Sequence, residues 1–391
     1  MKKHAKLHKI IFLGLLALLA VSLLAGCSSK EGDSGKEPYK IGAVLDISGA
    51  SSSLGIPEKN TLEMEVEKIN KKGGINGREI KLLVEDTKSI NEEALKAAKK
   101  LIEQDKVLAI IGTGSSTTSM AIKDYVQSAN IPMISLASSD QIVNPVKDRK
   151  FIFSTAQPVN VVAENIGAYL EKKNIKKVGF ISVNNAFGDN GKTEFFKMAQ
   201  KKGITIVAQE RFGAQDSDMT TQLTKIKGAN PQAIVVWATP PAATTVTKNY
   251  KTLGINVPLI HSHGVGNQEY IKDPAANGTV FPIGKIMVAE ELADNDPQKA
   301  NVTEYVNNYE STFNSSRSTF GGHAWDAIHM LEQAIGKAGA DPLKIRDELE
   351  KLNNFIGVTG VFHYSATDHS GLQKDAQVMV EVKNNKLQII E

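Results

Sequence analysis

Residues 107–140 constrain the fold of this chain most strongly, because they predict a strand, a helix and a second strand in direct succession. Residues 107–111 are apolar and β-branched, residues 118–129 carry a helical pattern, and residues 131–136 form a second apolar segment. Two strands joined through a helix lie parallel in one sheet, with a right-handed connection. The stretch therefore predicts an α/β fold with a parallel sheet.

Both strands of this unit end in a loop of small and hydroxylated residues. Gly112 and Gly114 precede residues 115–118 (SSTT) after the first strand, and residues 137–139 (ASS) follow the second. At the carboxyl edge of a parallel sheet, such loops offer N–H groups and hydroxyls, and the helix N-termini there favour anions. The two loops predict a site for a small carboxylate. The alternative is that their hydroxyls only cap helices and close turns.

The same alternation of strands and helices continues along the chain from Pro38. We predict strands at residues 40–46, 79–85, 107–111, 132–136, 151–154, 177–182, 204–210, 233–237, 258–261 and 278–282, and a last β segment from residue 361. We predict helices at residues 57–72, 91–104, 118–129, 159–173, 191–202, 219–228, 242–253, 300–313, 319–338 and 342–352. Two βα series of this length exceed a single core. The predicted fold class is α/β, with two Rossmann-like lobes, parallel-dominated sheets and a three-strand hinge.

The hinge sets the predicted division into lobes. The helices after Asp296 come with too few strands for a third domain, so we expect them to return to the first sheet. The chain would then cross between the lobes near residues 155, 286 and 360. The predicted N-terminal lobe is residues 39–155 plus 287–360, and the predicted C-terminal lobe is residues 156–286 plus 361–391.

The first 26 residues predict a signal peptide. Four lysines precede an apolar segment, residues 10–24, that is short for a membrane span, and residues 24–27 (LAGC) resemble a bacterial lipobox. Cleavage before Cys27 would place diacylglycerol on its thiol and leave residues 27–38 as a flexible tether. We therefore expect an extracytoplasmic protein attached to the lipid bilayer through Cys27. The alternative is an uncleaved anchor helix.

Charge and motif content exclude several functional classes. Without residues 1–26 the chain has 42 basic and 43 acidic residues, so no nucleic-acid partner is predicted. No P-loop, GxSxG or HExxH pattern occurs, and a hydrolase that uses a loop hydroxyl lacks a base at a readable spacing. We predict no catalytic residue, no cofactor and no metal. The alternatives are a dinucleotide loop at residues 112–114 and a metal pair at His261 and His263.

Several short motifs resemble those of one family of binding proteins. They are residues 72–77 (KGGING), 110–112 with Ser115 and Ser116, 131–135 (IPMIS), 187–189 (FGD) and 263–267 (HGVGN). In order and spacing they are similar to the substrate-binding proteins of ABC importers, in the leucine/isoleucine/valine-binding family with the type I periplasmic-binding-protein fold. The resemblance covers residues 39–385. It implies a non-enzymatic receptor, expected to be a monomer, that closes on a ligand and hands it to an ABC permease.

The resemblance also assigns carboxylate contacts to the two hydroxylated loops. It implies that Ser116, Ala137 and Ser139 hold the ligand carboxylate through hydroxyls and N–H groups. Ser138 lies between the last two in the same loop. We therefore include it among the predicted ligand-binding residues.

Three aromatic residues are predicted to surround the rest of the ligand. The resemblance places Phe187 over the ligand and Phe320 in an apolar wall. Trp237 ends a predicted strand just before a loop that should line the cleft, so we predict a ligand contact there too. The alternative for Trp237 is a place in the core.

Two positions depart from the amino-acid binders of this family. A second covering Tyr falls on Thr239, and the carboxylate that pairs with the ligand ammonium falls on His263. An ammonium buried without a partner is costly. We therefore predict an aromatic or other carboxylic acid that lacks an ammonium. The alternatives are a branched-chain or other hydrophobic amino acid as ligand, and a ligand-sensing module for a signalling partner.

The predicted anchor can be tested at Cys27. Metabolic labelling with a fatty acid should mark the wild type and leave a Cys27→Ser variant unlabelled, because the lipid is attached through the thiol. Equal labelling of the two proteins would contradict the predicted attachment.

Overall fold

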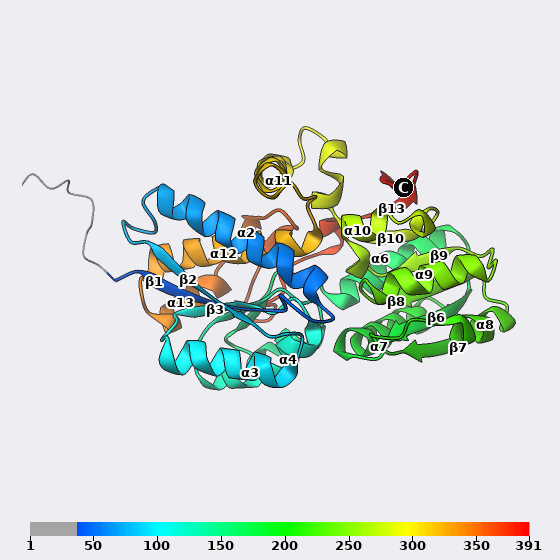
Figure 1. The fold of residues 1–391 in the computed structure, drawn as a ribbon, viewed down its shortest axis with the longest axis horizontal. Coiled ribbons are helices and arrows are strands. Elements are labelled where there is room, and N and C mark those ends of the chain that lie inside the picture. Colours follow the sequence, from blue (N-terminus) through cyan, green and yellow to red (C-terminus); the bar gives the residue numbers. More distant parts are fainter. Residues whose placement is uncertain (1–36, 391) are drawn as a thin grey trace, which may run out of the picture. The chain divides into compact units, whose positions relative to one another are not determined.

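The structure, a computed structural model, describes residues 37–390, which form two α/β lobes (Figure 1). The predicted signal peptide, Cys27 and most of the predicted tether lie outside the described residues. Within residues 37–390, no helix is both long enough and apolar enough to cross a membrane.

The N-terminal lobe contains a five-stranded parallel sheet in the order β2-β1-β3-β4-β5. Its strands are β1 (Tyr39–Leu45), β2 (Ile80–Asp86), β3 (Ala109–Gly112), β4 (Met133–Ser135) and β5 (Ile152–Ser154). Ile110 and Ile111 of the central strand β3 point to opposite faces, and both are fully buried. Burial on both faces explains why β3 has a continuous apolar sequence without alternation.

Helices cover both faces of this sheet. One face packs against α2 (Ser52–Lys71), α12 (Thr319–Ala338) and α13 (Pro342–Glu350), and the other against α3 (Asn91–Lys99) and α4 (Ser116–Ser128). The shorter elements of this part of the chain are the π-helix η1 (Lys100–Gln104), α5 (Asp140–Val143) and η2 (Val146–Asp148). Of the helices predicted to return to the first sheet, α12 and α13 do so, whereas apolar residues of the helix at 300–313 pack in the core of the second sheet.

The C-terminal lobe contains a seven-stranded sheet in the order β14-β13-β10-β9-β8-β6-β7. The parallel strands are β6 (Lys177–Val183), β7 (Thr205–Phe212), β8 (Ala233–Trp237), β9 (Leu259–His261) and β10 (Val280–Gly284). An antiparallel hairpin of β13 (Gln377–Lys383) and β14 (Lys386–Ile389) extends the sheet beyond β10. Both large sheets are therefore parallel-dominated, and the predicted fold class is confirmed.

The remaining helices accompany the second sheet and the connections between the lobes. They are α6 (Val159–Lys172), α7 (Ala186–Lys201), α8 (Thr220–Gly228), α9 (Ala242–Thr252), η3 (His263–Val265), α10 (Gln268–Ile271), η4 (Pro274–Ala276), η5 (Lys285–Glu291), α11 (Lys299–Phe313) and η6 (Lys374–Ala376). Helix α11 packs on η5, and its Tyr305 hydroxyl lies 2.8 Å from the Thr61 hydroxyl of α2.

The ten predicted strands are present with ends within two residues, but two helix starts were wrong. Helix α2 begins at Ser52, five residues before Pro57, because the N–H groups of Leu54 and Gly55 already donate to the Ser51 carbonyl. Helix α7 begins at Ala186, where the Asn185 side chain caps its first turn. The glycines near its start permit close packing: a Cβ on Gly191 would lie 2.3 Å from the Trp237 ring.

The third crossing between the lobes lies later than predicted. Strands β11 (Asn353–Ile356) and β12 (Val361–His363) form a separate hairpin, and Phe362, Tyr364 and Leu372 pack in the core of the N-terminal lobe. The chain joins the second sheet only at β13. The predicted boundary at residue 360 is therefore wrong, because these apolar side chains are buried in the first core.

Two residues of α12, Asp326 and His323, join residues 358–359 to the first crossing between the lobes. The Asp326 carboxylate accepts hydrogen bonds from the Val358 N–H (2.7 Å), the Thr359 N–H (3.1 Å) and the Thr359 hydroxyl. In the same helix, the His323 carbonyl accepts one from the Thr155 hydroxyl at 2.9 Å. Burial raises the pKa of Asp326 to about 7. Helix α12 therefore holds the first crossing and residues 358–359 together.

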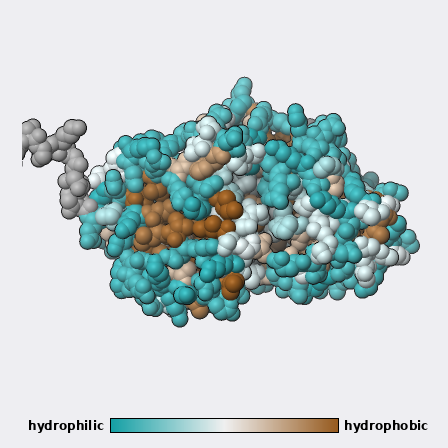
Figure 2. Space-filling view, in the orientation of Figure 1, coloured by the Kyte–Doolittle hydropathy of each residue, from teal (hydrophilic) through white to brown (hydrophobic). Residues whose placement is uncertain are grey.

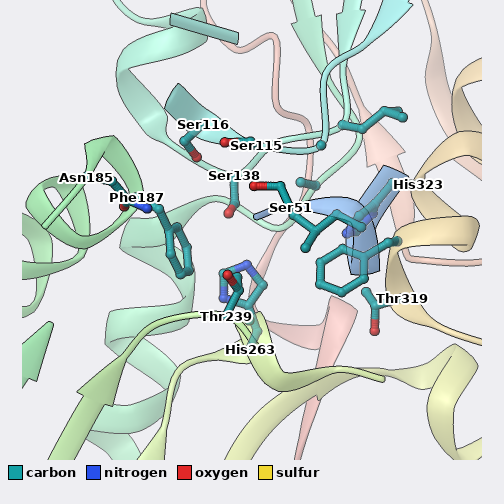
Figure 3. A pocket seen from close by; sticks show the side chains of 16 residues that line it. Ser51, Ser115, Ser116, Ser138, Asn185, Phe187, Thr239, His263, Thr319 and His323 are labelled. Atoms are coloured by element: carbon teal, nitrogen blue, oxygen red, sulfur yellow. The ribbon is translucent and has the colours of Figure 1, made fainter. Parts of the chain in front are cut away.

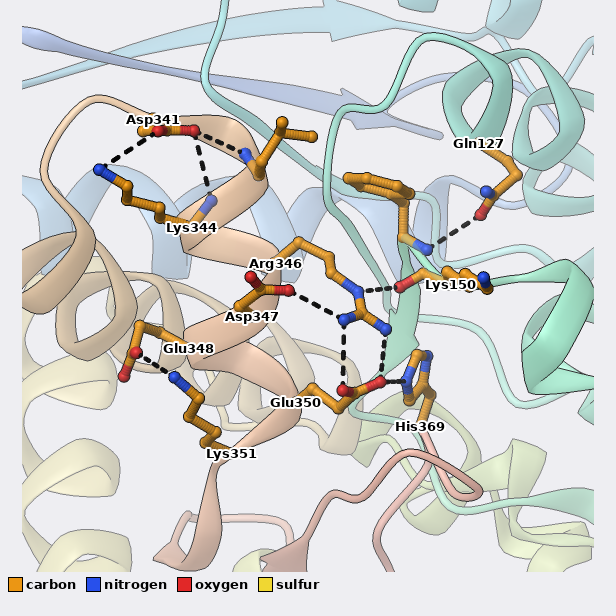
Figure 4. Close-up of polar contacts among 12 residues, drawn as sticks. Gln127, Lys150, Asp341, Lys344, Arg346, Asp347, Glu348, Glu350, Lys351 and His369 are labelled. Atoms are coloured by element: carbon orange, nitrogen blue, oxygen red, sulfur yellow. Dashed lines mark hydrogen bonds and ion pairs between the residues drawn. The ribbon is translucent and has the colours of Figure 1, made fainter.

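A polar network fixes α13 against the end of the first sheet (Figure 4). The Arg346 guanidinium pairs with the Glu350 carboxylate through both terminal nitrogens, and its Nε donates to the Lys150 carbonyl at 2.7 Å. His369 Nε2 lies 3.3 Å from Glu350, and its ring stacks on Phe153 with centroids 4.0 Å apart. The network joins three segments that are distant in sequence.

An apolar area lies on the N-terminal lobe between α2 and α3 (Figure 2). Leu82 and Val84 of the edge strand β2 are partly exposed, and with Val66 they line a shallow groove. Charged side chains, including Glu79 and Lys71, also line this groove. Charges beside an edge strand oppose pairing with a strand of another chain.

Candidate functional site

One cavity lies where loops at the carboxyl ends of both sheets meet the start of α12 (Figure 3). Its empty volume is about 530 Å³, including the opening to solvent. The lining residues are Ser51, Leu54, Gly114, Ser115, Ser116, Leu136, Ser138, Ala156, Asn185, Phe187, Thr239, His263, Gly264, Thr319, Phe320 and His323. None of them is Asp, Glu, Lys or Arg.

The first hydroxylated loop forms the N-terminus of α4 at the cavity wall. The Ser115 hydroxyl caps the helix by accepting a hydrogen bond from the Thr117 N–H at 3.3 Å, and the Ser115 N–H donates to Asp46 at 3.1 Å. Ser116 is the first residue of α4, and Figure 3 shows its side chain at the cavity. A hydroxyl at a helix N-terminus suits an anionic ligand group.

The second hydroxylated loop contributes less than the sequence predicted. Ser138 lines the cavity, but Ala137 and Ser139 do not. The Ala137 N–H, predicted to bind the ligand, donates instead to the Ser135 hydroxyl at 3.2 Å. Ser139 is 3% exposed, and its hydroxyl has no hydrogen-bond partner among residues 37–390.

Aromatic and polar side chains form the facing part of the cavity. Phe187 projects from the first turn of α7, and Thr239 and His263 follow β8 and β9. Trp237 is placed differently from the prediction: it is fully buried in the core, with its ring centroid 6.0 Å from that of Phe187. Trp237 therefore packs beside Phe187 without lining the cavity. Phe320, from α12, completes the predicted set that lines the cavity.

His323, which was not among the predicted residues, lines the same cavity as His263. His323 lies three residues after Phe320 in α12, so the two share one helix face. That spacing would have identified it. Asn185 was also missed, because its role in capping α7 became visible only once the helix start was known.

Two α/β lobes with a cavity at their loop ends are the arrangement in which two-lobed binding proteins hold small molecules. Residues 38–386 match the model of the Periplasmic binding protein family. The chain belongs to this family.

Individual relatives support the same assignment. The chain is 24% identical over 351 residues to the leucine-, isoleucine-, valine-, threonine- and alanine-binding protein of Pseudomonas aeruginosa, which covers 88% of this chain and 90% of that protein. An extracellular ligand-binding receptor from Rhodopseudomonas palustris HaA2 is similar in structure, with a TM-score of 0.85 and 29% identity over 91% of this chain and 100% of that chain. The branched-chain amino acid transporter substrate binding protein LivJ from Streptococcus pneumoniae, solved with isoleucine, gives a TM-score of 0.80 and 27% identity over 90% and 98%. The predicted family resemblance is confirmed.

A buried acid, Glu58 of α2, lies behind the first loop. Its carboxyl oxygens have no hydrogen-bond partner among residues 37–390, and a Cβ on Gly114 would lie 2.1 Å from Oε1. Burial, and then the Asp46 carboxylate, raises the pKa of Glu58 well above its usual value. Burial therefore favours the uncharged form of Glu58, which packs against the loop that carries Ser115 and Ser116.

Replacing Glu58 with Gln should reduce the dependence of stability on pH. The unfolded chain releases this proton near pH 4.5, whereas the folded chain retains it to higher pH, so the wild type loses stability as pH rises above about 4.5. Glutamine does not titrate. The free energy of unfolding of Glu58→Gln, relative to wild type, should therefore increase between pH 4.5 and 8. Urea denaturation at several pH values measures this difference.

The matched control for this prediction is Glu63→Gln on the same helix. Glu63 is 47% exposed and pairs with Lys59 at 3.1 Å. Its replacement should change stability by less than about 0.5 kcal/mol. A difference between Glu58→Gln and wild type that stayed constant from pH 4.5 to 8 would show that Glu58 is not held uncharged.

Proposed function

We propose that this protein captures a small carboxylic acid that lacks an ammonium group and delivers it to the permease of an ABC importer. The composition of the cavity is the observation that supports this proposal most directly, because its lining includes no Asp, Glu, Lys or Arg. An ammonium enclosed there would lose its hydration without gaining a carboxylate partner. A carboxylate alone does not need such a partner.

The hydroxylated loops support the carboxylate end of this proposal. The hydroxyls of Ser115, Ser116 and Ser138 lie at the cavity beside the N-terminus of α4 (Figure 3). Hydroxyl donors and a helix N-terminus together stabilise an anion. Phe187 and Phe320 provide apolar contacts for the body of the ligand, which favours an aromatic acid.

The proposed role is binding and delivery, without catalysis. The relatives reported above are named as binding proteins. Closure of two lobes on a ligand is a population shift, and both lobes contribute contacts to it. Attachment outside the cytoplasm through lipid on Cys27 belongs to the same proposal and rests on the LAGC pattern.

A branched-chain or other hydrophobic amino acid is the second candidate ligand. The observation in its favour is the similarity to a leucine-, isoleucine-, valine-, threonine- and alanine-binding protein and to LivJ solved with isoleucine. The two candidates differ in the need for an anionic partner in the cavity.

A comparison of ligands tests this difference. Isothermal titration calorimetry should show tighter binding of an aromatic acid without an α-ammonium, such as 3-phenylpropanoate, than of leucine or phenylalanine. His263→Glu should weaken the acid by charge repulsion and improve the amino acids by supplying the missing partner. Tight leucine binding by the wild type that His263→Ala leaves unchanged would restore the amino-acid assignment.

The carboxylate contact can be tested at Ser116. A charge-assisted hydrogen bond contributes roughly 1.5 to 3 kcal/mol, so Ser116→Ala should weaken acid binding about ten- to a hundredfold. Its melting temperature without ligand should change little. Ser128→Ala, at the exposed far end of the same helix, is the matched control and should leave the affinity unaltered. Equal affinities of Ser116→Ala and wild type would leave the first loop with only a capping role.

A further inference from the structure

We propose that His263 and His323 form a two-imidazole subsite for an uncharged hydroxyl group on the ligand, at the end remote from its carboxylate. This inference rests on the proposed function and deepens it, because it narrows the ligand class to hydroxylated monocarboxylic acids. The inference is supported by two buried side chains from different lobes. Both line one cavity, and both are incompletely hydrogen-bonded.

The two histidines reach the cavity from different parts of the fold. His263 opens η3, directly after β9 of the C-terminal lobe, whereas His323 lies in the second turn of α12 on the N-terminal lobe. Both line the cavity, with exposed fractions of 6% and 2%. Figure 3 shows His263 and Thr239 across the cavity from Ser115 and Ser116, with His323 to one side. A ligand held by the serine hydroxyls would extend toward the imidazoles.

Each imidazole has a nitrogen that the fold leaves without a hydrogen bond. Nδ1 of His263 and Nδ1 of His323 are buried and have no partner among residues 37–390. The Phe187 ring meets His263 nearly edge-on, with centroids 5.7 Å apart, and supplies no acceptor. Buried polar atoms are nearly always hydrogen-bonded, so such atoms beside a cavity indicate a missing polar partner. A ligand oxygen between the rings would supply it.

Both rings are uncharged at neutral pH. Burial lowers the pKa of His263 and of His323 to about 3, and the proximity of His263 contributes to the lowering for His323. Neither ring can therefore balance a second carboxylate on the ligand, and neither can serve as the anionic partner of an ammonium. An uncharged dipole on the ligand suits two neutral rings better than a second charged group does.

A hydroxyl suits two neutral imidazoles better than a carbonyl oxygen does. A neutral imidazole has one N–H donor and one acceptor nitrogen, and a hydroxyl both donates and accepts. A hydroxyl can therefore bond one ring as donor and the other as acceptor. A carbonyl oxygen requires both rings to present an N–H.

Titration of the purified protein with acids that differ at one position tests the subsite. The probes are 3-phenylpropanoate and its 4-hydroxy, 4-acetyl and 4-carboxy derivatives on the ring. We expect the hydroxyl to lower the Kd of the wild type roughly tenfold, as two additional hydrogen bonds would. The acetyl and carboxy derivatives should bind less tightly than the hydroxylated acid.

Variants test whether the two imidazoles cause the lower Kd of the hydroxylated acid. His263→Leu and His323→Leu should each bring the ratio of the Kd values of the unsubstituted and the hydroxylated acid close to one. His323→Gln keeps a donor and an acceptor and should retain part of the preference. The matched control is His329→Gln on the same helix: His329 pairs with Glu65 and Glu332 outside the cavity, so the ratio should not change. Melting temperatures confirm that each variant is folded.

Two failures are distinguishable. If the acids bind but the hydroxyl gives no gain, or the gain survives both leucine variants, the subsite is overturned and the proposed function stands. If the wild type binds leucine and none of the four acids, the proposed ligand class is overturned and the subsite with it.

Discussion

The packing of α12 against the first crossing and residues 358–359 is the constraint on which the rest of the structure depends. Asp326 holds the backbone of residues 358 and 359, and the His323 carbonyl, one turn earlier, holds the Thr155 hydroxyl. The same early turns of α12 bring Phe320 and His323 to the cavity. Because a protein interior is close-packed, α12 cannot shift without moving Thr155, residues 358–359 and the cavity wall. Hinge geometry and ligand contacts are thus coupled through one helix.

The electrostatics of the cavity follow from how the neighbouring acids are placed. Asp46 accepts hydrogen bonds from the Ser115 N–H and from the Thr87 and Thr118 hydroxyls, so its carboxylate is hydrogen-bonded within the protein. Glu58 is fully buried, and burial raises its pKa, which favours its uncharged form. Neither acid lines the cavity. The loop therefore presents hydroxyls and a helix N-terminus to the ligand, an arrangement that suits an anion and offers nothing to a cation.

Much of the fold was predictable because its signals are local. Strands buried on both faces have continuous apolar sequences, so their positions were found within two residues. The two wrong helix starts came from a proline and a glycine, Pro57 and Gly191. Gly191 indicated a later start for α7, but its missing side chain serves close packing against Trp237. The boundary at residue 360 failed because the burial of Phe362 and Tyr364 in the first core is a long-range property.

The sequence by itself determined the family, the parallel-sheet architecture and six cavity residues: Ser116, Ser138, Phe187, Thr239, His263 and Phe320. Motif order, apolar runs and hydroxylated loops are properties of neighbouring residues, and a sequence displays them directly. Only the tertiary structure decided which groups remain available. In the tertiary structure, the Ala137 N–H donates to the Ser135 hydroxyl and Trp237 is buried in the core. His323 lines the same cavity as His263, whose loop lies some sixty residues earlier in the chain. These outcomes depend on which side of a loop or helix faces the cavity, and packing between distant segments sets that orientation.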